Sequence, residues 1–226
     1  MSLSLRIPAG VLVLLLLAGL GFAQQEYVSR YDAFAGFSYL NSPKLNLVER
    51  GVNVEAGVNA TRWLALGVDY SYFSGHSTLF PQDLTTALQQ QLAAIVPPGV
   101  AIAVPFDSIT YTFTAGPQFN YRGFKWITLF ARPAIGGMHQ LATLNPTTPL
   151  TTLLVAQLVP GNKKSDLEPF FGVGGGFDLN ASKHVGVRVA FDYVHVNLFD
   201  GFLKESRNSL RMSVGPSFRF GRNVVK

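Results

Sequence analysis

Apolar and polar residues alternate one by one along most of this chain, which limits it to β-strands whose two faces meet different surroundings. The clearest stretch covers residues 109–121. Its odd-numbered positions read Ile, Tyr, Phe, Ala, Pro, Phe, Tyr, and its even-numbered positions read Thr, Thr, Thr, Gly, Gln, Asn. Successive side chains of a strand point to opposite faces, whereas a helix would mix the two sets. This stretch therefore predicts a long strand with one apolar face.

Seven more segments repeat this alternation. They cover residues 31–40, 51–59, 64–73, 126–138, 167–180, 185–193 and 210–220. The pattern slips only after Tyr193, where Val194 and Val196 fall on the polar face. A β-bulge, or the exit of the strand from a membrane, would account for the slip.

The connections between these segments alternate in length, which favours a closed barrel over a soluble sandwich. Short turns are expected near residues 60–62, 122–125 and 181–183, and long loops near residues 41–47, 77–107, 141–166 and 200–208. Strands of about 10–14 residues exceed the usual 5–6 of soluble sheets. Short turns at one end, long loops at the other and an even strand number are typical of outer-membrane barrels. We expect an all-β, eight-stranded antiparallel up-and-down transmembrane β-barrel with long extracellular loops.

The composition agrees with a membrane protein that lacks membrane-spanning helices. Charged residues make up 14% and hydrophobic residues 48% of the chain, whereas soluble domains carry about 25% charged residues. The one long apolar run, residues 7–23, is interrupted by Pro8 and lies at the N-terminus. The absence of cysteine excludes disulfides, zinc–cysteine sites, thiol enzymes and a lipoprotein anchor. The net charge of +5 is dispersed, so no nucleic-acid partner is expected.

The N-terminal run has the organisation of an export signal. Arg6 precedes an apolar stretch, and Gly21 and Ala23 supply the small residues of a cleavage site, with Gln24 as the mature start. The alternative, an uncleaved anchor helix, would need about 20 uninterrupted apolar residues. We expect a signal peptide over residues 1–23 and a barrel domain over residues 24–226.

Ten charged residues fall on the polar face of the strands and would point into the lumen. They are Asp32, Glu55, Asp69, Arg132, Glu168, Asp178, Arg188, Asp192, Arg211 and Arg219. The interior of an eight-stranded barrel is only wide enough for side chains to fill, and buried charges must be paired. The set predicts a plug of salt bridges, and the alternative is a narrow gated ion path.

Aromatic residues on the apolar face predict girdles at the two membrane interfaces. Trp63 and Trp126 both follow short turns, which would place them at the periplasmic side with Tyr121 and Phe220. The outer belt would contain Tyr39, Tyr72 and Tyr193. The alternative is that these aromatics fill a core.

An internal echo links two parts of the chain. The sequence NATRWL at residues 59–64 matches NASKHV at residues 180–185, and each is followed by an inward Asp and an outward Tyr, Asp69-Tyr70 and Asp192-Tyr193. The echo predicts two related hairpins in one barrel. Both Asn residues fit the glycosylation sequon, but turn chemistry explains them better.

These features together resemble the small outer-membrane β-barrel family, which includes the transmembrane domain of outer membrane protein A and the opacity-type surface proteins. The resemblance covers residues 27–221 and ends on a terminal strand with Ser-Phe-Arg-Phe at residues 217–220. Unlike the family's last strand, which usually ends at its aromatic, this chain continues to residue 226. The resemblance implies the eight-stranded fold and an outer-membrane location.

Two long loops contain similar amphipathic segments, residues 85–92 and 151–158. Asp83 would cap the first helix and Pro97 would stop it. Apolar residues fall on one stripe of each helix: Leu84, Leu88, Leu92 and Ile95 in the first, and Leu150, Leu154 and Leu158 in the second. Exposed stripes of this kind would bind the outer leaflet, a partner protein or a hydrophobic ligand. The alternative is that the two helices pack on each other as a lid.

Catalytic motifs are absent. The sequence contains no GxxxxGK, HExxH or GxSxG element and no pair of histidines at a metal-binding spacing, so neither a metal nor a cofactor is expected. Ser74, His76 and Asp107 share the outward face near the outer rim. They are the remaining candidates for a serine-type triad acting on lipid.

We therefore expect a non-catalytic outer-membrane protein with a structural or surface-interaction role through its apolar extracellular loops. The alternative is a narrow channel or carrier for small hydrophobic solutes, and an outer-membrane lipid hydrolase ranks third. The expected partners are outer-membrane lipid and a surface partner or hydrophobic ligand at the loops, with the barrel itself a monomer.

Overall fold

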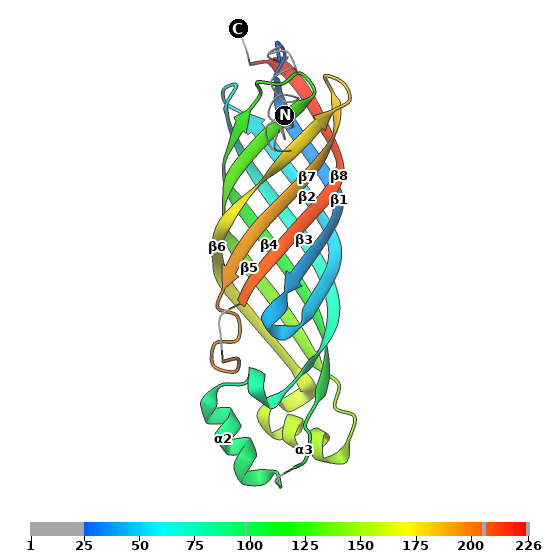
Figure 1. Ribbon diagram of the computed structural model, residues 1–226, viewed down its shortest axis with the longest axis vertical. Helices are drawn as coiled ribbons and strands as arrows, with labels where there is room; N and C mark the ends of the chain where they lie inside the picture. The colour runs from blue at the N-terminus through cyan, green and yellow to red at the C-terminus, as the bar shows by residue number, and fades with distance from the viewer. Residues whose placement is uncertain (1–24, 98, 205–206, 225–226) are drawn as a thin grey trace, which may run out of the picture.

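The chain forms a closed barrel of eight antiparallel strands, in which each strand pairs with the next and β8 closes on β1. Figure 1 presents the computed structural model, which describes residues 25–97, 99–204 and 207–224. The strands are β1 (Ser29–Ser42), β2 (Leu47–Asn59), β3 (Leu64–Leu79), β4 (Val104–Tyr121), β5 (Ile127–Leu144), β6 (Lys163–Asn180), β7 (Val185–Val196) and β8 (Arg207–Asn223). The predicted fold class is confirmed. The predicted signal peptide lies outside the described residues.

The two ends of the barrel differ. The lid end carries two α-helices, α2 (Thr86–Ile95) and α3 (Pro149–Leu158), and the short 3₁₀ turns η1 (Pro43–Leu45), η2 (Pro81–Asp83) and η3 (Pro160–Asn162). The turn end carries the short connections β2–β3, β4–β5 and β6–β7 together with both ends of the described chain (Figure 1). Neither α-helix is long and apolar enough to cross a membrane, within the part of the chain that the structure describes.

The strands reach further toward the lid end than the alternation predicts, so the loops there are shorter. β3 continues to Leu79 and pairs with β4 from Val104 onward, and β5 continues to Leu144 beside β6, which begins at Lys163. The part of β3 beyond its predicted end contains Ser74 and His76, whose side chains point outward. Because polar residues occupy the outer face there, the contrast between faces fades while the backbone hydrogen bonding persists.

The slip in the pattern after Tyr193 is not a β-bulge. β7 keeps its register with β8 to its last residue, Val196, which pairs with Arg207. Val194 and Val196 point inward and are buried with Met138 in an apolar cluster. The two valines keep the inward orientation that alternation along β7 gives them, and the slip arises because the lumen is apolar near the end of β7.

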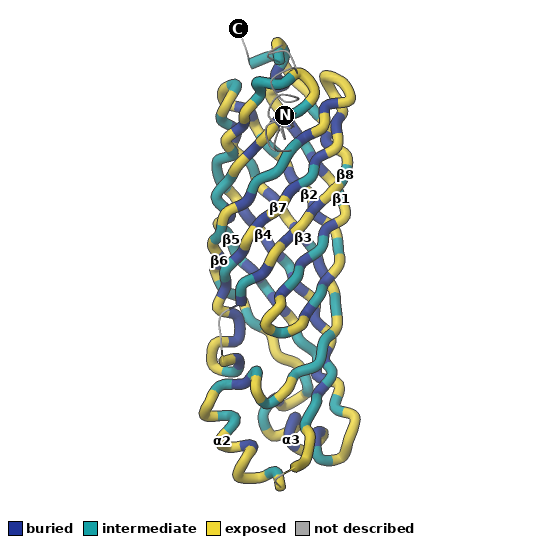
Figure 2. Tube along the Cα trace, in the orientation of Figure 1, coloured by how far each residue is buried: buried dark blue, intermediate teal, exposed yellow. Residues whose placement is uncertain are grey.

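Buried and exposed residues alternate along the strands (Figure 2). Away from the lid end, the buried residues are mostly polar and the exposed ones mostly apolar, the reverse of a soluble protein. On β1 and β2, the outward Phe37 and Val52 are exposed, whereas the inward Ser38 and Asn53 are completely buried. Ser38 hydrogen-bonds Ser213 at 2.7 Å, and the Asn53 amide donates to Ser71 at 2.7 Å. Both bonds join residues that lie directly opposite each other on neighbouring strands, so these inward polar groups find partners within the wall of the barrel.

One interval of the wall lacks strand pairing. Pro117 on β4 faces Pro133 on β5, and the pairing of these strands stops at Thr114 and resumes at Phe119. Proline has no backbone N–H, so two facing prolines remove both donors from the ladder at this point. A cavity of about 30 Å³ lies behind the interval and is lined by Pro117, Pro133 and charged lumen residues. It is large enough for one water molecule.

Candidate functional site

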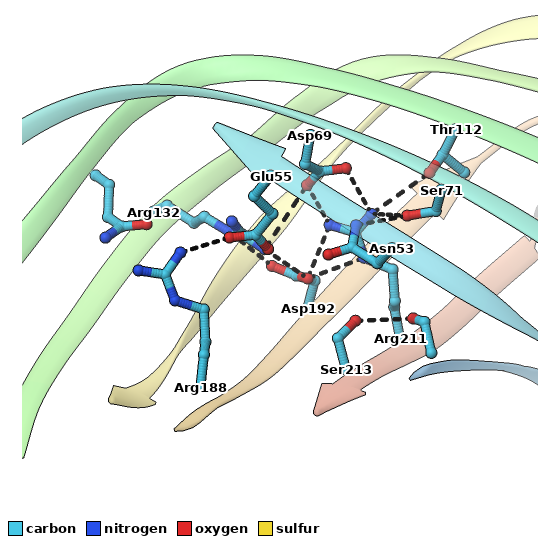
Figure 3. A network of polar contacts seen from close by, with 12 residues as sticks. Asn53, Glu55, Asp69, Ser71, Thr112, Arg132, Arg188, Asp192, Arg211 and Ser213 are labelled. Carbon is cyan, nitrogen blue, oxygen red and sulfur yellow. Dashed lines mark hydrogen bonds and ion pairs between the residues drawn. The ribbon is translucent and has the colours of Figure 1, made fainter. Parts of the chain in front are cut away.

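A network of arginines and carboxylates crosses the middle of the lumen (Figure 3). Arg211 on β8 donates two hydrogen bonds to Asp69 at 2.7 and 2.9 Å and one to Asp192 at 2.9 Å. Arg132 on β5 contacts Asp192 at 3.1 Å and Glu55 at 3.0 Å. The two guanidiniums thus share Asp192, and Arg132 also lies 3.7 Å from Asp69.

The network continues toward the turn end through Arg188 on β7. Its guanidinium contacts Asp178 at 2.8 Å, Glu55 at 2.7 Å and Asp32 at 3.4 Å. Arg219 adds a second ion pair to Asp178 at 3.2 Å. Glu55 joins the two halves because one of its carboxylate oxygens contacts Arg132 and the other contacts Arg188.

Aromatic rings cover the cations on their other faces. The guanidinium carbon of Arg188 lies 5.1 Å from the ring centre of Phe130 and 5.9 Å from that of Phe34, and that of Arg132 lies 5.8 Å from Phe130. A cation held over a ring is attracted to its electron-rich face. Phe34 and Phe130 therefore fill the lumen without leaving the arginines in a purely apolar environment.

Nine of the ten charged residues with inward parity lie in this network. The exception is Glu168, which is partly exposed and makes no ion pair with another described residue. The sequence missed a second pair, Glu49 and Arg207, which lie 3.8 Å apart nearer the lid end. Glu49 also accepts hydrogen bonds from Ser108 at 2.8 Å and Thr110 at 2.7 Å. Both residues occupy strand ends that lie beyond the predicted strands.

An apolar plug fills the lumen between the network and the lid. It consists of two clusters of buried side chains, which are Ala134, Met138, Phe170, Val194, Val196, Leu198, Phe199 and Leu203, and Leu47, Val104, Phe106, Leu144, Val155 and Val159. Leu79 and Phe202 pack against both clusters. In the described part of the connection between β7 and β8, Leu198, Phe199 and Leu203 are therefore buried in the mouth of the barrel.

The helices α2 and α3 form a lid over the plug. Leu84, Leu92 and Leu154 are buried in a shared lid core, and Leu88, Leu150 and Leu158 pack against it. Backbone hydrogen bonds tie the lid to the plug, from Thr85 to the Phe202 carbonyl at 3.0 Å and from Lys204 to the Asp83 carbonyl at 2.9 Å. Two apolar cavities of about 40 Å³ each remain beneath the helices.

The predicted apolar stripes therefore face each other in the packed arrangement of the lid alternative. Leu84, Leu92 and Leu154 are buried, and Leu88, Leu150 and Leu158 are half-buried. Only Ile95 is exposed. The predicted cap also differs: α2 begins after Thr85, while Asp83 closes η2 by accepting a hydrogen bond from the Phe80 backbone at 2.8 Å. The spacing of the leucines predicts the helices, but it does not predict which surface their apolar faces contact.

No protein-family model and no curated protein sequence matches this chain. Several solved structures match it over most of its length. Among them are Ail, the attachment invasion locus protein of Yersinia pestis (13% identity, TM-score 0.50, 87% of this chain and 100% of that one), Neisserial surface protein A (12%, 0.51, 84% and 96%) and the outer membrane protein OprG from Pseudomonas aeruginosa (9%, 0.51, 88% and 99%). The chain has the fold of the eight-stranded outer-membrane β-barrels.

Outer-membrane barrels carry aromatic girdles, and this barrel has exposed aromatic residues at its turn end. Trp63, Trp126, Tyr121 and Phe220 are all exposed there, and Trp63 stacks on Phe119 with ring centres 6.2 Å apart. Further along the wall, Tyr193 is exposed, whereas Tyr39 and Tyr72 are half-buried. The ring centres of Tyr72 and Tyr111 lie 5.4 Å apart, and Tyr111 stacks on His139 with ring centres 6.1 Å apart. These outward rings form a row across β3, β4 and β5.

The three candidate triad residues lie on the outer wall of the barrel near the lid end. The register sets His76 directly opposite Asp107, and Ser74 lies two residues from His76 on the same face. No hydrogen bond joins any two of them among the described residues, and the Asp107 carboxylate accepts instead from the Asn145 amide at 2.7 Å. A serine nucleophile needs a hydrogen-bonded base, so the arrangement lacks the contacts of a triad.

Proposed function

We propose that the protein is a non-catalytic, non-conducting barrel of the bacterial outer membrane, and that it acts through its helical lid at the cell surface. In outer-membrane barrels the short turns face the periplasm and the longer loops face outward. On this orientation the turn end is periplasmic and the lid end is extracellular. The exposed apolar wall supports a lipid environment.

The observation that carries the proposal is that the lumen is blocked at two successive levels. The arginine–carboxylate network fills the middle of the barrel, and the apolar plug and lid cover it toward the lid end. Side chains fill a small barrel of this width. An ion would have to displace paired charges and then pass an apolar layer, so neither level offers a hydrated path.

We expect the purified protein to produce no stable channel openings in a planar bilayer. An ion inside the lumen would have to break ion pairs such as Arg188–Glu55 at 2.7 Å, which costs several kcal/mol once water is excluded. Single-channel recording in molar salt measures this directly. Stable, reproducible openings from protein whose heat-modifiable gel migration proves folding would contradict the non-conducting assignment and favour the channel alternative.

The outer surface of the lid supports a role in contact with apolar surfaces. Residues 80–103 and 145–162 contain one charged residue, Asp83, although surfaces of soluble proteins are rich in charge. Leu153 on α3 is 71% exposed and Ile95 on α2 is 55% exposed, and Phe80 and Val100 are also exposed. The lid thus buries one apolar face and presents further apolar side chains to the outside.

We expect cells that display the protein to adhere to hexadecane droplets more than cells that display a Leu153→Glu, Ile95→Glu variant. The two substitutions add charge at exposed positions, so the lid core remains intact while the apolar contact area decreases. Partitioning of a host without long surface polysaccharide between water and hexadecane provides the measurement. A Gln90→Glu, Gln91→Glu variant of α2 adds the same charge at exposed polar positions. Equal adhesion by all three strains would contradict a role for the apolar side chains.

A carrier of small hydrophobic solutes is the second candidate because the cavities beneath the lid have almost purely apolar linings. Each holds only about 40 Å³, whereas sites for organic ligands usually enclose about 300–1,000 Å³. A solute would therefore require the lid to open. The closed lid favours surface contact over carriage.

A further inference from the structure

A cavity of about 530 Å³ lies at the turn end, far from the lid. Its size falls in the range of ligand sites. Residues 25–28 cross the mouth of the barrel as a strap above it, and the β4–β5 and β6–β7 turns form its sides. The inner wall is the turn-end edge of the charged network, with Arg188 and Asp32.

The strap is anchored on opposite sides of the mouth. The Gln25 amide donates to the Phe124 carbonyl and to Thr128, both at 3.0 Å. On the other side, the Tyr27 hydroxyl donates to the Gly221 carbonyl at 2.7 Å, and the Val28 N–H donates to Asn223 at 2.9 Å. These contacts hold the cavity open between the strap and the network.

The cations around this cavity outnumber the available anions. Arg122, Lys125 and Lys183 line it, and none of them has a carboxylate within 4 Å among the described residues. The carboxylates of the inner wall, Asp32 and Asp178, are already in ion pairs with Arg188. The remaining acid of the lining is Glu26, which is exposed on the strap.

Arg122 is the most constrained of these cations. Its guanidinium donates only to neutral acceptors, Asn59 at 2.9 Å and the Arg62 carbonyl. Burial lowers the pKa of Arg122 to about 10, because nearby Asp32 and Asp178 offset only part of the lost hydration. The half-buried side chain therefore stays charged at neutral pH without a direct counter-ion, and a charge removed from water is costly unless it is paired.

Two buried polar atoms of the lining also lack partners. The side-chain amide oxygen of Asn180 and the Ser29 hydroxyl make no hydrogen bond, although both residues are at least nine-tenths buried. Both residues line the cavity. Buried polar groups are nearly always hydrogen-bonded. The Ser29 hydroxyl can donate to an anion, whereas the Asn180 oxygen only accepts, so a hydroxyl of the ligand would have to satisfy it.

We propose that the turn-end cavity binds a phosphate group, with Arg122, Lys125 and Lys183 as its positive partners. Phosphate accepts hydrogen bonds in several directions, and this suits cations that converge from two different turns. The exposed Trp126 beside the cavity belongs to the aromatic residues of the turn end, which sit at headgroup depth in outer-membrane barrels. A phospholipid headgroup and a free phosphate ion both supply the required group.

The test uses Trp126 as a reporter of binding at the cavity. A Trp63→Phe background leaves Trp126 as the only tryptophan, and its fluorescence is recorded in neutral detergent while inorganic phosphate is added at constant ionic strength against chloride. A second titration uses short-chain phosphatidylglycerol. Saturation with phosphate alone assigns the site to a free anion, and saturation with the lipid alone assigns it to a headgroup. Both results support the proposal.

We expect Arg122→Gln to weaken binding about tenfold or more, because hydrogen bonds between charged partners contribute about 1.5–3 kcal/mol each. Lys183→Gln, an exposed substitution that leaves the Arg122 contacts intact, is expected to weaken it as well. Arg222→Gln is the matched control, since Arg222 is exposed at the same end but does not line the cavity. Heat-modifiable migration verifies folding of each variant. Absence of saturation with both ligands, or equal weakening by Arg222→Gln and Lys183→Gln, would overturn the proposal.

Discussion

Replacing Arg211 with methionine is expected to lower the free energy of unfolding of the barrel by about 3–5 kcal/mol. Arg211 is almost completely buried and holds Asp69 and Asp192 through three charge-assisted hydrogen bonds of 2.7–2.9 Å. After the substitution, Asp69 keeps only Arg132, at 3.7 Å. The loss is large because a buried carboxylate without its partner keeps its full desolvation cost.

The measurement is urea-induced unfolding in lipid vesicles, followed by tryptophan fluorescence and gel migration. Arg50→Met provides the control, because Arg50 is exposed on the outer face of β2 and changes the net charge equally. Adding Asp69→Leu to Arg211→Met should recover part of the lost stability, since an apolar pair costs less than one stranded charge. Unfolding midpoints that are equal for Arg211→Met and Arg50→Met would refute the importance of the network.

The alternation predicted the orientation of the lumen charges but not their partners. Parity alone assigns Asp69 and Asp192 to the interior, and the echo between their hairpins marks them as related positions. Their convergence on Arg211 depends on the stagger between strands around the closed barrel, which backbone hydrogen bonds determine. Strand register has no signature in the local pattern of one strand. Pairs such as Arg188 and Glu55, 133 positions apart, were therefore beyond prediction.

Residues at the two ends were harder to predict for a different reason. Arg122 lies in a turn, where no periodicity indicates which way a side chain points, and its role depends on the strap that crosses the mouth. Glu49 and Arg207 lie on strand ends near the lid, where the apolar and polar faces differ little. For Glu49 and Arg207 a signal was present, because each is a charged residue at inward parity once its strand is extended.

The lid illustrates the limit of an amphipathic stripe. The spacing of Leu150, Leu154 and Leu158 predicts a helix with one apolar face, and α3 forms over these residues. The same spacing is compatible with burial against a second helix or with an exposed docking face. The α3 stripe is buried because α2 packs against it through Leu92, whereas Leu153 on the opposite side of α3 remains exposed.

The Leu154→Asp substitution should open the lid while leaving the barrel folded. Leu154 is 5% exposed and packs in the lid core, and a carboxylate there would lose its hydration without gaining a partner, at a cost of several kcal/mol. The eight-stranded ladder does not include the lid helices, so the cost is expected to fall on the lid alone. Opening of the lid by a few kcal/mol raises protease cleavage within α2 and α3 by about 100-fold or more.

Limited proteolysis with fragment masses measures this opening, and heat-modifiable migration reports the barrel. Leu153→Asp is the matched control, because it places the same group one residue away at a position that is 71% exposed. Equal cleavage of the Leu154→Asp and Leu153→Asp proteins would contradict the packed lid. The opened variant also tests the part that the lid plays in blocking the lumen. If it still conducts no ions, the network and the plug seal the barrel without the lid. If it conducts, the closed lid is required for the seal.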